Sequence, residues 1–353
     1  LIHIAVDGRP LVEHPTSAAA QHLLEWINGL SGPETKFSLV HPDGELPELP
    51  PGVRSWPVGP IRRGWERLRY DQITLPRAVA QAGAELLLTF SDGIPLKARM
   101  PIAVVPPIDP RASEAGILEI LRTAAGRAGL RGANTILIAA DLAGTTHSGR
   151  RYPPFVSPPF LRPEVESAGA ERQQVLCYDT NPEDIRTALA AWTWVDGSLG
   201  DTYPLQFLSW DPQVEELIAT TAAEFDVADS VRTRPPTKLL SQLYRRAAAV
   251  LSVRLVAWGQ PFRWALASGV PVVGFESPSA NSILGDAGYL VPDGDTRALG
   301  AACLSLLVQD ELAESLRVRG RRRAAAYRDR PPVELIAELA DRSGSLVGRR
   351  APS

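Results

Sequence analysis

The sequence predicts an α/β protein built from two consecutive doubly wound domains. Short apolar runs alternate with stretches of helical periodicity along most of the chain, which is typical of parallel sheets covered by helices on both faces. The alternation stops in a proline-rich stretch, residues 151–163, and then starts again, so this stretch is the best linker in the chain. The length of 353 residues is too great for one ordinary compact core and accommodates two.

The first half of the chain, expected to form a domain over residues 1–160, begins with a buried strand. Residues 2–6 are apolar and end at a turn over residues 7–10,. Apolar residues at helical spacing then predict a helix over 18–30,. Residues 42–59 are rich in proline and glycine and are predicted as a loop,. The other elements predicted here are a strand over 37–40, a helix over 66–82, strands over 85–89 and 102–105, a helix over 113–128 and a strand over 135–139.

The second half, expected to form a domain over residues 161–328, repeats the pattern. It opens with a strand over 174–178 and a helix over 182–192. Because ligands of open α/β sheets bind at the carboxyl ends of the strands, we expect a cleft between the two domains. Residues 329–353 are expected to form a C-terminal helix and tail. The other elements predicted here are a strand over 205–209, a helix over 212–224, a short strand over 231–232, a helix over 238–247, strands over 249–253 and 271–274 flanking residues 262–267, and helices over 295–308 and 311–327.

Composition argues against several classes of partner. The net charge of −3 gives no support for nucleic acid or an anionic membrane as a ligand. The densest basic cluster, residues 319–323, is interpreted as a solvated helix face. No apolar run reaches the ~18 residues that a membrane span needs, and residues 1–6 are interpreted as a strand and not as a signal peptide.

Cysteine usage indicates the compartment. Cys177 and Cys303 are the only cysteines, and they are far apart and lack metal-ligand spacing. We therefore expect no disulfide and no metal, and a reducing compartment, the cytoplasm, fits this pattern.

Several segments of the second half together resemble a known family. Residues 243–247, the stretch Ala267-Ser268-Gly269-Val270-Pro271, and residues 285–294 with their Gly-Asp-Ala-Gly-Tyr sequence are similar to the donor-binding half of the family-four retaining glycosyltransferases. Weaker matches extend the resemblance over roughly residues 2–328. It implies a GT-B fold, in which two Rossmann-like domains face a deep cleft, with the acceptor side in the first domain and the nucleotide-sugar donor side in the second.

Three places that serve the donor in that family are altered here. The turn after the first strand is rich in glycine in the family, but residues 14–20 contain no glycine. A histidine near the sugar is replaced by the two prolines of residues 106–107. An Arg/Lys pair that neutralises the diphosphate falls in a turn that instead contains Asp179, Glu183 and Asp184, and carboxylates repel a diphosphate.

Two further places have lost their carboxylates. The resemblance aligns the paired glutamates of an E-x7-E motif with Val256 and Trp264, and a glutamate of the next loop with Ser282. Trp264 and its neighbour Trp258 are either plugs that fill the vacated donor pocket or a stacking platform for a different ring. The residues predicted to line the donor pocket are Trp258, Gly259, Gln260, Trp264, Ser279, Asn281 and Ser282.

Other polar residues have two possible roles each. Asp7 and Arg9 either face the cleft or cap the first turn, and His3 is expected to be packed in the sheet. His22 would lie near the cleft entrance, with no acid or base paired to it in the sequence.

These observations leave three hypotheses for function. The first is a catalytically degenerate pseudo-glycosyltransferase that binds a glycan or a protein partner, such as an active glycosyltransferase of envelope-sugar synthesis. The second is an active retaining glycosyltransferase that moves a sugar from a nucleotide-sugar donor through an altered donor site. The third is a regulator that binds a sugar or a nucleotide without turnover. Nucleotide-sugar would be a substrate in the second hypothesis, and no cofactor is expected in any of them.

Overall fold

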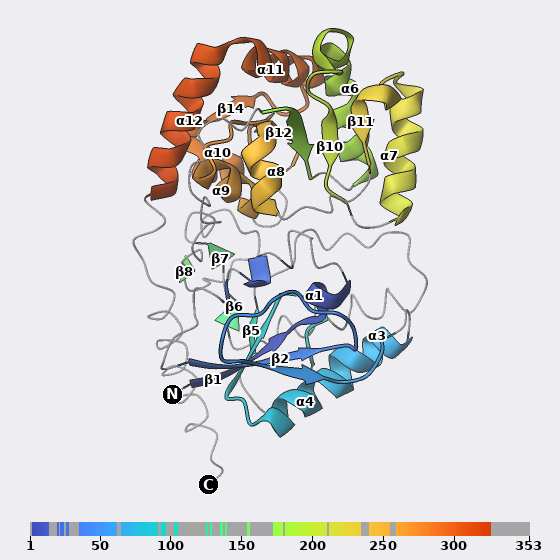
Figure 1. Cartoon of the computed structure of the whole chain (residues 1–353), viewed down its shortest axis with the longest axis vertical. Coiled ribbons are helices and arrows are strands. Elements are labelled where there is room, and N and C mark those ends of the chain that lie inside the picture. The colour runs from blue at the N-terminus through green and yellow to red at the C-terminus, as the bar shows by residue number, and fades with distance from the viewer. Residues whose placement is uncertain are drawn as a thin grey trace. The chain divides into compact units, whose positions relative to one another are not determined.

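The computed structural model divides into two compact units, each with its own sheet (Figure 1). One unit comprises Leu1–Pro15, Ala19–Pro158 and Arg330–Ser353, and the other comprises Thr16–Ala18 and Pro159–Asp329. The domain boundaries predicted after residues 160 and 328, and the predicted tail, lie outside the residues that the structure describes. Those residues are 2–13, 20, 22–24, 26–27, 35–61, 65–90, 93–96, 102–104, 125, 128, 135–136, 138–139, 154–155, 172–178, 181–209, 212–233, 240–254 and 259–325.

The N-terminal unit is built on a six-stranded parallel sheet with the order β3-β2-β1-β4-β5-β6. The central strand β1 pairs in parallel with β2 on one side and with β4 on the other. This is the doubly wound order, and its switch point lies between β1 and β4. The strands are β1 (Ile2–Asp7), β2 (Thr35–His41), β3 (Val53–Pro57), β4 (Leu86–Thr89), β5 (Ile102–Val104) and β6 (Thr135–Ile136).

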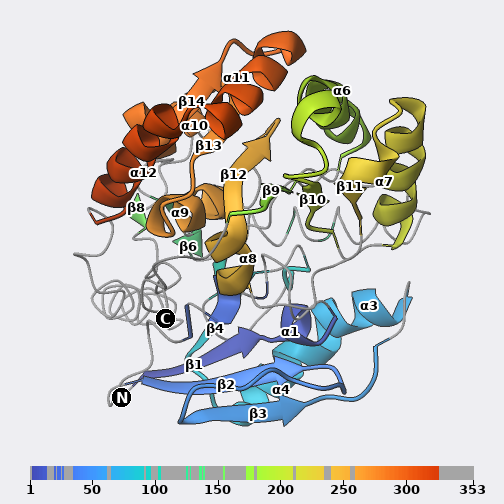
Figure 2. The same cartoon turned by 45° about the horizontal axis from the view of Figure 1, so that its top comes forward.

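The C-terminal unit repeats this order in a second six-stranded parallel sheet, β11-β10-β9-β12-β13-β14. Figure 2 shows β12 running through the middle of it. The switch point here lies between β9 and β12, which pair in parallel,. The strands are β9 (Gln174–Cys177), β10 (Leu205–Phe207), β11 (Val231–Arg232), β12 (Ala247–Ser252), β13 (Val272–Phe275) and β14 (Gly288–Val291).

Local sequence signals explain where several helices begin. The Asn181 side chain caps the helix α6 by accepting a hydrogen bond from the Glu183 backbone at 3.0 Å, and Pro182 occupies the first turn,. Asp295 caps α11 in the same way through the Ala298 backbone at 2.8 Å. The helices of the N-terminal unit are α1 (Arg9–Glu13), α3 (Trp65–Arg69), the π-helix η1 (Tyr70–Thr74) and α4 (Leu75–Ala82).

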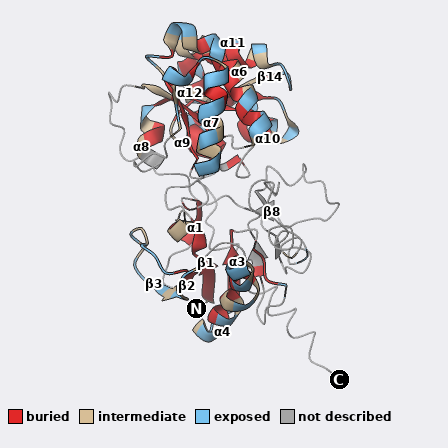
Figure 3. Ribbon diagram, turned by 90° about the vertical axis from the view of Figure 1, so that its right-hand side faces the viewer, coloured by how far each residue is buried: buried red, intermediate tan, exposed pale blue. Residues whose placement is uncertain are grey.

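Helices also flank the second sheet and contribute to its core. The helices are α6 (Pro182–Leu199), α7 (Pro212–Glu224), η3 (Ala228–Ser230), α8 (Leu240–Arg246), α9 (Gln260–Ala267), α10 (Pro278–Leu284), η5 (Gly285–Ala287), α11 (Thr296–Val308) and α12 (Asp310–Ala325). Figure 3 shows these helices with buried residues in red and exposed residues in pale blue, the amphipathic pattern of helices that cover a sheet,. Trp192 is fully buried in this core, and its indole donates a hydrogen bond to Ser230 Oγ at 2.9 Å.

Most predicted elements are present, with several differences in extent. Helix α6 continues seven residues beyond the predicted end at Trp192, to Leu199. The predicted 66–82 helix contains the π-helical turn η1 between α3 and α4. The predicted strand at 135–139 is divided into β6 and β7 (Ile138–Ala139), and β7 pairs with β8 (Pro154–Phe155) at the start of the proline-rich stretch. Of the helix predicted over 113–128, the structure describes only residues 125 and 128, both helical.

Several elements were not predicted. The predicted loop over 42–59 contains the strand β3, which pairs with β2 at the edge of the sheet. It was missed because an edge strand is half exposed and lacks the apolar run of a central one,. The turn predicted over residues 7–10 runs into the short helix α1, because Pro10 is compatible with a first helical turn,. Strand β14 and helix α10 were not predicted, and both are short and only partly buried.

The close contact between α6 and α11 generates a stability prediction at Gly300. A Cβ atom at Gly300 would lie 2.5 Å from the Ala191 backbone oxygen and 2.7 Å from the Trp194 ring. We expect Gly300→Ala to lower the free energy of unfolding by about 1–3 kcal/mol, because the two helices must move apart. Urea unfolding followed by tryptophan fluorescence measures this change.

The control is Gly197→Ala on α6, where a Cβ atom would meet nothing within 4 Å. We expect that substitution to leave stability unchanged or to raise it by up to about 1 kcal/mol, because alanine favours the helix. Equal effects at the two positions would contradict the packing described here.

Candidate functional site

The carboxyl edge of the second sheet is where a doubly wound domain binds its ligand, beside the switch point. Strand β9 ends there at Cys177 and leads to the N-terminus of α6, and strand β12 ends there at Ser252 and leads to Arg254. Asp179 of the first connection, and Val256 and Trp258 of the second, lie outside the described residues.

An ion pair connects the two sides of this switch point. Arg254 Nε lies 2.6 Å from Asp184 Oδ1, in the first turn of α6, and its Nη2 lies 4.0 Å from Glu183 Oε2. The Asp184 side chain is 6% exposed and that of Arg254 is 47% exposed. The Arg254 backbone oxygen also accepts a hydrogen bond from Ser252 Oγ at 2.6 Å. The cation is thus held on the β12 side, and the carboxylates are on the α6 side.

This arrangement determines what the N-terminus of α6 can bind. A helix N-terminus attracts anions through its free N–H groups and the helix dipole. Here the Asn181 side chain accepts from the Glu183 N–H, and the first turn already carries two carboxylates. An incoming diphosphate would therefore meet negative charge at the position where a phosphate-binding domain offers positive charge.

Trp264 lies in the core of the unit, with no exposed surface. Its ring packs edge-on against Tyr244 at a centroid distance of 6.3 Å, and Tyr244 stacks on Tyr178 at 6.4 Å. The Tyr244 hydroxyl donates a hydrogen bond to the Pro261 carbonyl at 3.0 Å. This aromatic cluster joins the end of β9, the helix α8 and the helix α9, so Trp264 is part of the packing that holds α9 in place.

The described ones among the other predicted pocket residues lie on, or directly before, two neighbouring helices, α9 and α10, which contact each other. Gly259 is buried, has a left-handed backbone with a φ of 74°, and precedes α9, which starts at Gln260,. On α10, Ser279 and Ser282 are half-buried and Asn281 is exposed. The Ser282 carbonyl accepts a hydrogen bond from Arg323, so that residue also fixes α12. The structure thus brings the predicted residues of α9 and α10 near one another, while the Gln260 side chain and Trp258 fall outside its described part.

Arg254 and Tyr244 are the residues of this edge that the sequence prediction missed. Arg254 lies only two positions before Val256 in the altered donor loop, so a cation next to a lost carboxylate was a signal that could have been used. Tyr244 lies in the segment 243–247 that carries the family resemblance, but nothing in that segment shows that its ring packs against Trp264.

The carboxyl edge of the N-terminal sheet holds a buried ionic network. Arg9 Nη1 donates to Asp71 Oδ1 at 2.9 Å, and Arg9 Nη2 lies 3.5 Å from Asp7 Oδ2. Tyr70 donates to Asp7 Oδ1 at 2.9 Å, and the Arg9 guanidinium lies 5.5 Å from its ring centre. Arg9 is 2% exposed and both carboxylates are fully buried. Asp7 and Arg9 were predicted either to face a cleft or to cap a turn. The structure supports the cap, because Asp7 Oδ1 accepts a hydrogen bond from the Arg9 backbone N–H at 3.2 Å, and it buries both side chains together with Asp71 on η1.

The carboxylates of this network stabilise the protonated forms of Arg9 and Tyr70. Burial alone would lower the pKa of Arg9, but the carboxylates of Asp71 and then Asp7 outweigh burial and raise that pKa above its usual value,. Burial, and then the Asp7 charge, raise the pKa of Tyr70, so the phenol stays a proton donor. A Cβ atom at Gly93 would overlap with the Asp71 carboxyl group, so the chain after β4 passes close to that carboxylate.

The two histidines of this unit that were considered are both packed. His3 is buried as predicted, and its Nε2 lies 2.9 Å from Ser38 Oγ on the neighbouring strand. Burial is the main cause that lowers the pKa of His3. His22 accepts a hydrogen bond from the Trp26 indole at 3.1 Å and packs edge-on against Phe90, which follows β4.

Two kinds of feature are absent from the part of the chain that the structure describes. It contains no group of three or more histidine, cysteine, aspartate or glutamate side chains able to hold a metal ion. Nor is any of its helices both long and apolar enough to cross a membrane.

Solved structures share the fold of this chain, and the matches extend over nearly its full length. Sucrose-phosphate synthase from Thermosynechococcus elongatus superposes with a TM-score of 0.71 at 17% identity, and the match covers 99% of each chain. WaaG, a glycosyltransferase involved in lipopolysaccharide biosynthesis, gives 0.71 at 13% identity and covers 97% of this chain and 99% of its own. A UDP-forming α,α-trehalose-phosphate synthase from Burkholderia vietnamiensis gives 0.68 at 12% identity over 98% of each chain. The predicted GT-B fold, with two Rossmann-like domains, is thereby confirmed.

Comparison of the sequence with family models and with curated proteins gives no match. At identities of 12–17%, the solved structures establish the fold of the chain and leave its chemistry to be argued from the site.

The buried network around Arg9 generates the first prediction from these sites. We expect Arg9→Met to lower the free energy of unfolding by about 3–5 kcal/mol, because it leaves two buried carboxylates without their cation. Urea or thermal unfolding of the purified chain measures the loss. Arg186→Met, which breaks an exposed pair with Glu224 at 2.7 Å, is the control and should change stability by at most about 1 kcal/mol. A loss at Arg9 no larger than at Arg186 would refute the role of the network.

Trp264 generates the second prediction. We expect Trp264→Ala to destabilise the chain by about 3–5 kcal/mol, because it removes a fully buried ring from the aromatic cluster. Trp194→Ala is the matched control, since Trp194 is 44% exposed. Its ring lies beside Gly300 of α11 and 5.3 Å from the Arg297 guanidinium. That change should lower stability by about 1 kcal/mol. If both substitutions had similarly small effects in urea unfolding, Trp264 would not be a packing residue.

Proposed function

We propose that this chain is a glycosyltransferase-like protein that has lost its donor chemistry and acts as a binding or partner subunit in glycan or envelope-sugar synthesis. The observation that carries the proposal is the ion pair between Arg254 and Asp184 at the switch point of the second sheet. The resemblance to the family-four enzymes implies cations after β9 and carboxylates after β12. This chain has carboxylates after β9 and a cation after β12, so the polarity of the site is inverted.

Charge inversion matters because glycosyl transfer from a nucleotide sugar depends on stabilising a departing diphosphate. Each missing cation or carboxylate typically removes ~2–4 kcal/mol of transition-state stabilisation. Arg254 lies two positions before Val256, one of the aligned glutamate positions, and it is already paired with Asp184. A diphosphate would have to compete with that carboxylate and with Glu183 for the same guanidinium.

The burial of Trp264 supports the same proposal. The aligned glutamate of the family would hold a ligand hydroxyl, but the ring here has no exposed surface and packs on Tyr244. Of the two interpretations of this residue, burial favours the plug over the stacking platform. We propose the same plug interpretation for Trp258. The proposal also includes domain boundaries after residues 160 and 328 and a cytoplasmic location.

The second candidate is an active retaining glycosyltransferase with an altered donor site. Gly259 favours it, because a buried glycine with a left-handed backbone at the start of α9 suits the close approach of a ligand to the main chain. Ser279, Asn281 and Ser282 on the neighbouring helix would then supply hydroxyl and amide groups to that ligand. One of the similar solved structures is described as UDP-forming, which makes a uridine nucleotide the first ligand to test.

A thermal-shift series distinguishes the candidates. We expect UDP, GDP, ADP, TDP and their sugars to leave the melting temperature of the full chain unchanged, because the diphosphate position carries carboxylates. A ligand present at 100 times its Kd adds about 2.7 kcal/mol, which raises the melting temperature of domains of this size by several degrees. A shift of that size with one nucleotide, lost in Ser282→Ala and kept in the distant Ser305→Ala, would contradict the proposal and favour the second candidate.

A further inference from the structure

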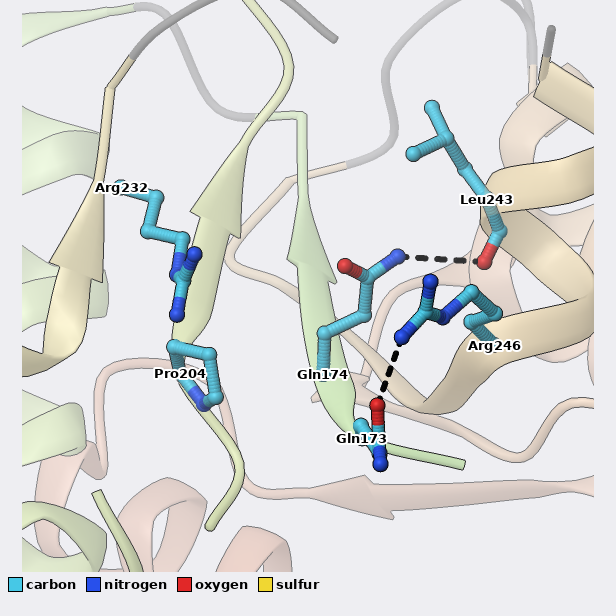
Figure 4. A pocket seen from close by; sticks show the side chains of 6 residues that line it. All are labelled: Gln173, Gln174, Pro204, Arg232, Leu243 and Arg246. Atoms are coloured by element: carbon cyan, nitrogen blue, oxygen red, sulfur yellow. Dashed lines mark hydrogen bonds between the residues drawn. The ribbon is translucent and has the colours of Figure 1, made fainter. Parts of the chain in front are cut away.

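A pocket of about 190 Å³ lies at the opposite, amino-terminal edge of the second sheet. Its lining comes from the start of β9, the residue before β10, the end of β11 and the end of α8. Figure 4 shows the six lining residues, Gln173, Gln174, Pro204, Arg232, Leu243 and Arg246. The pocket is therefore separate from the carboxyl edge, where the switch point and the Arg254–Asp184 pair lie.

The polar groups of the pocket are held in fixed positions by their own hydrogen bonds. Gln174 Nε2 donates to the Leu243 carbonyl at 3.2 Å, and Arg246 Nη2 donates to Gln173 Oε1 at 2.6 Å. Backbone groups at this edge are also occupied, since the Gln173 N–H donates to the Arg246 carbonyl at 2.9 Å. The carbonyl oxygens at the end of α8, which would repel an anion, are thus partly covered by donors.

Two guanidinium groups enter the pocket from different elements, Arg232 from β11 and Arg246 from α8, with Gln174 between them in Figure 4. Among the described residues, Arg232 has no side-chain hydrogen bond or ion pair. Arg246 is bonded to a neutral amide and not to a carboxylate. None of the six lining residues is acidic, so no carboxylate among the described lining residues offsets the charge of the two guanidinium groups.

Further arginines surround the same edge. Arg172 donates to the Ala247 carbonyl, directly after Arg246, at 3.0 Å. Burial, and then the charges of Arg317 and Arg321 on α12, lower the pKa of Arg172 to about 10. The carboxylate nearest to these cations, Glu314, bonds to Arg317 at 3.3 Å and to Arg321 at 3.1 Å. Among the described residues, Arg172 is therefore influenced by two further guanidinium groups and one carboxylate.

The size of the pocket limits the ligand. Pockets that enclose drug-sized molecules have volumes of ~300–1,000 Å³, so 190 Å³ suits one small group and not a nucleotide sugar. Guanidinium groups pair with phosphate and carboxylate oxygens through parallel hydrogen bonds, and the fixed glutamines add neutral polar contacts. We propose that this pocket binds a small oxyanion, a phosphate or a carboxylate group, between Arg232 and Arg246. This site does not depend on whether the carboxyl edge retains any donor chemistry.

Calorimetric titration of the full-length chain with inorganic phosphate tests the proposal, with sodium chloride of equal ionic strength as the reference. We expect saturable binding of phosphate, and at least a tenfold loss of affinity in Arg232→Gln and in Arg246→Gln, because each removes a charged hydrogen-bond donor. Arg322→Gln, an arginine exposed on α12 and 3.7 Å from Asp286, should bind phosphate as the unmodified chain does.

A parallel titration with acetate identifies the source of the oxyanion. Tighter binding of phosphate indicates a phosphorylated ligand, and tighter binding of acetate indicates a carboxylated one. Arg232→Gln removes no described side-chain contact, so this variant should remain folded and provides a fair test even if Arg246→Gln is unstable. The proposal is overturned if neither anion binds more strongly than chloride, or if binding is unchanged in Arg232→Gln.

Discussion

The parallel pairing of β9 with β12 is the constraint on which the chemistry of this protein depends. Pairing these strands at the switch point of the second sheet places the start of α6 beside the segment that follows β12. Asp184 and Arg254 are 70 residues apart in sequence, and the pairing brings their side chains to 2.6 Å. In a doubly wound domain this is the place for a phosphate. The same geometry that would assemble a donor site here assembles an ion pair within the protein.

The aromatic residues of the same unit contribute to its packing. Trp264 shares a buried aromatic cluster with Tyr244 and Tyr178, and burying such rings stabilises a fold more than a desolvated carboxylate would. The carboxyl edge of the N-terminal sheet also contains an ion pair within the protein, because Arg9 is buried between Asp7 and Asp71. A buried ion pair adds little net stability, but it becomes costly to break. Charged groups at both carboxyl edges are therefore bonded to the protein itself.

Much of the fold could be predicted from the sequence, because central strands such as β1 and β12 are mostly apolar and can be recognised from their own residues. Edge strands such as β3 could not be predicted, because their composition does not differ from that of a loop. Only the pairing of β3 with β2 identifies it as a strand. The order of weak motifs predicted the GT-B fold, which similar solved structures confirm. The position of Trp264 in the altered loop could be predicted, but its contact with Tyr244 could not. The Arg254–Asp184 pair was missed because no local pattern connects residues so far apart.

The proposed loss of donor chemistry is tested most directly by turnover. The purified chain would be incubated with a mixture of UDP-, GDP-, ADP- and TDP-sugars, and the release of free nucleoside diphosphate followed by mass spectrometry. The inverted charge at the switch point predicts no release above that of a heat-denatured sample over many hours. Release of one nucleoside diphosphate that persists through repurification, and that falls at least tenfold in Gly259→Val, would contradict the account and identify an active transferase.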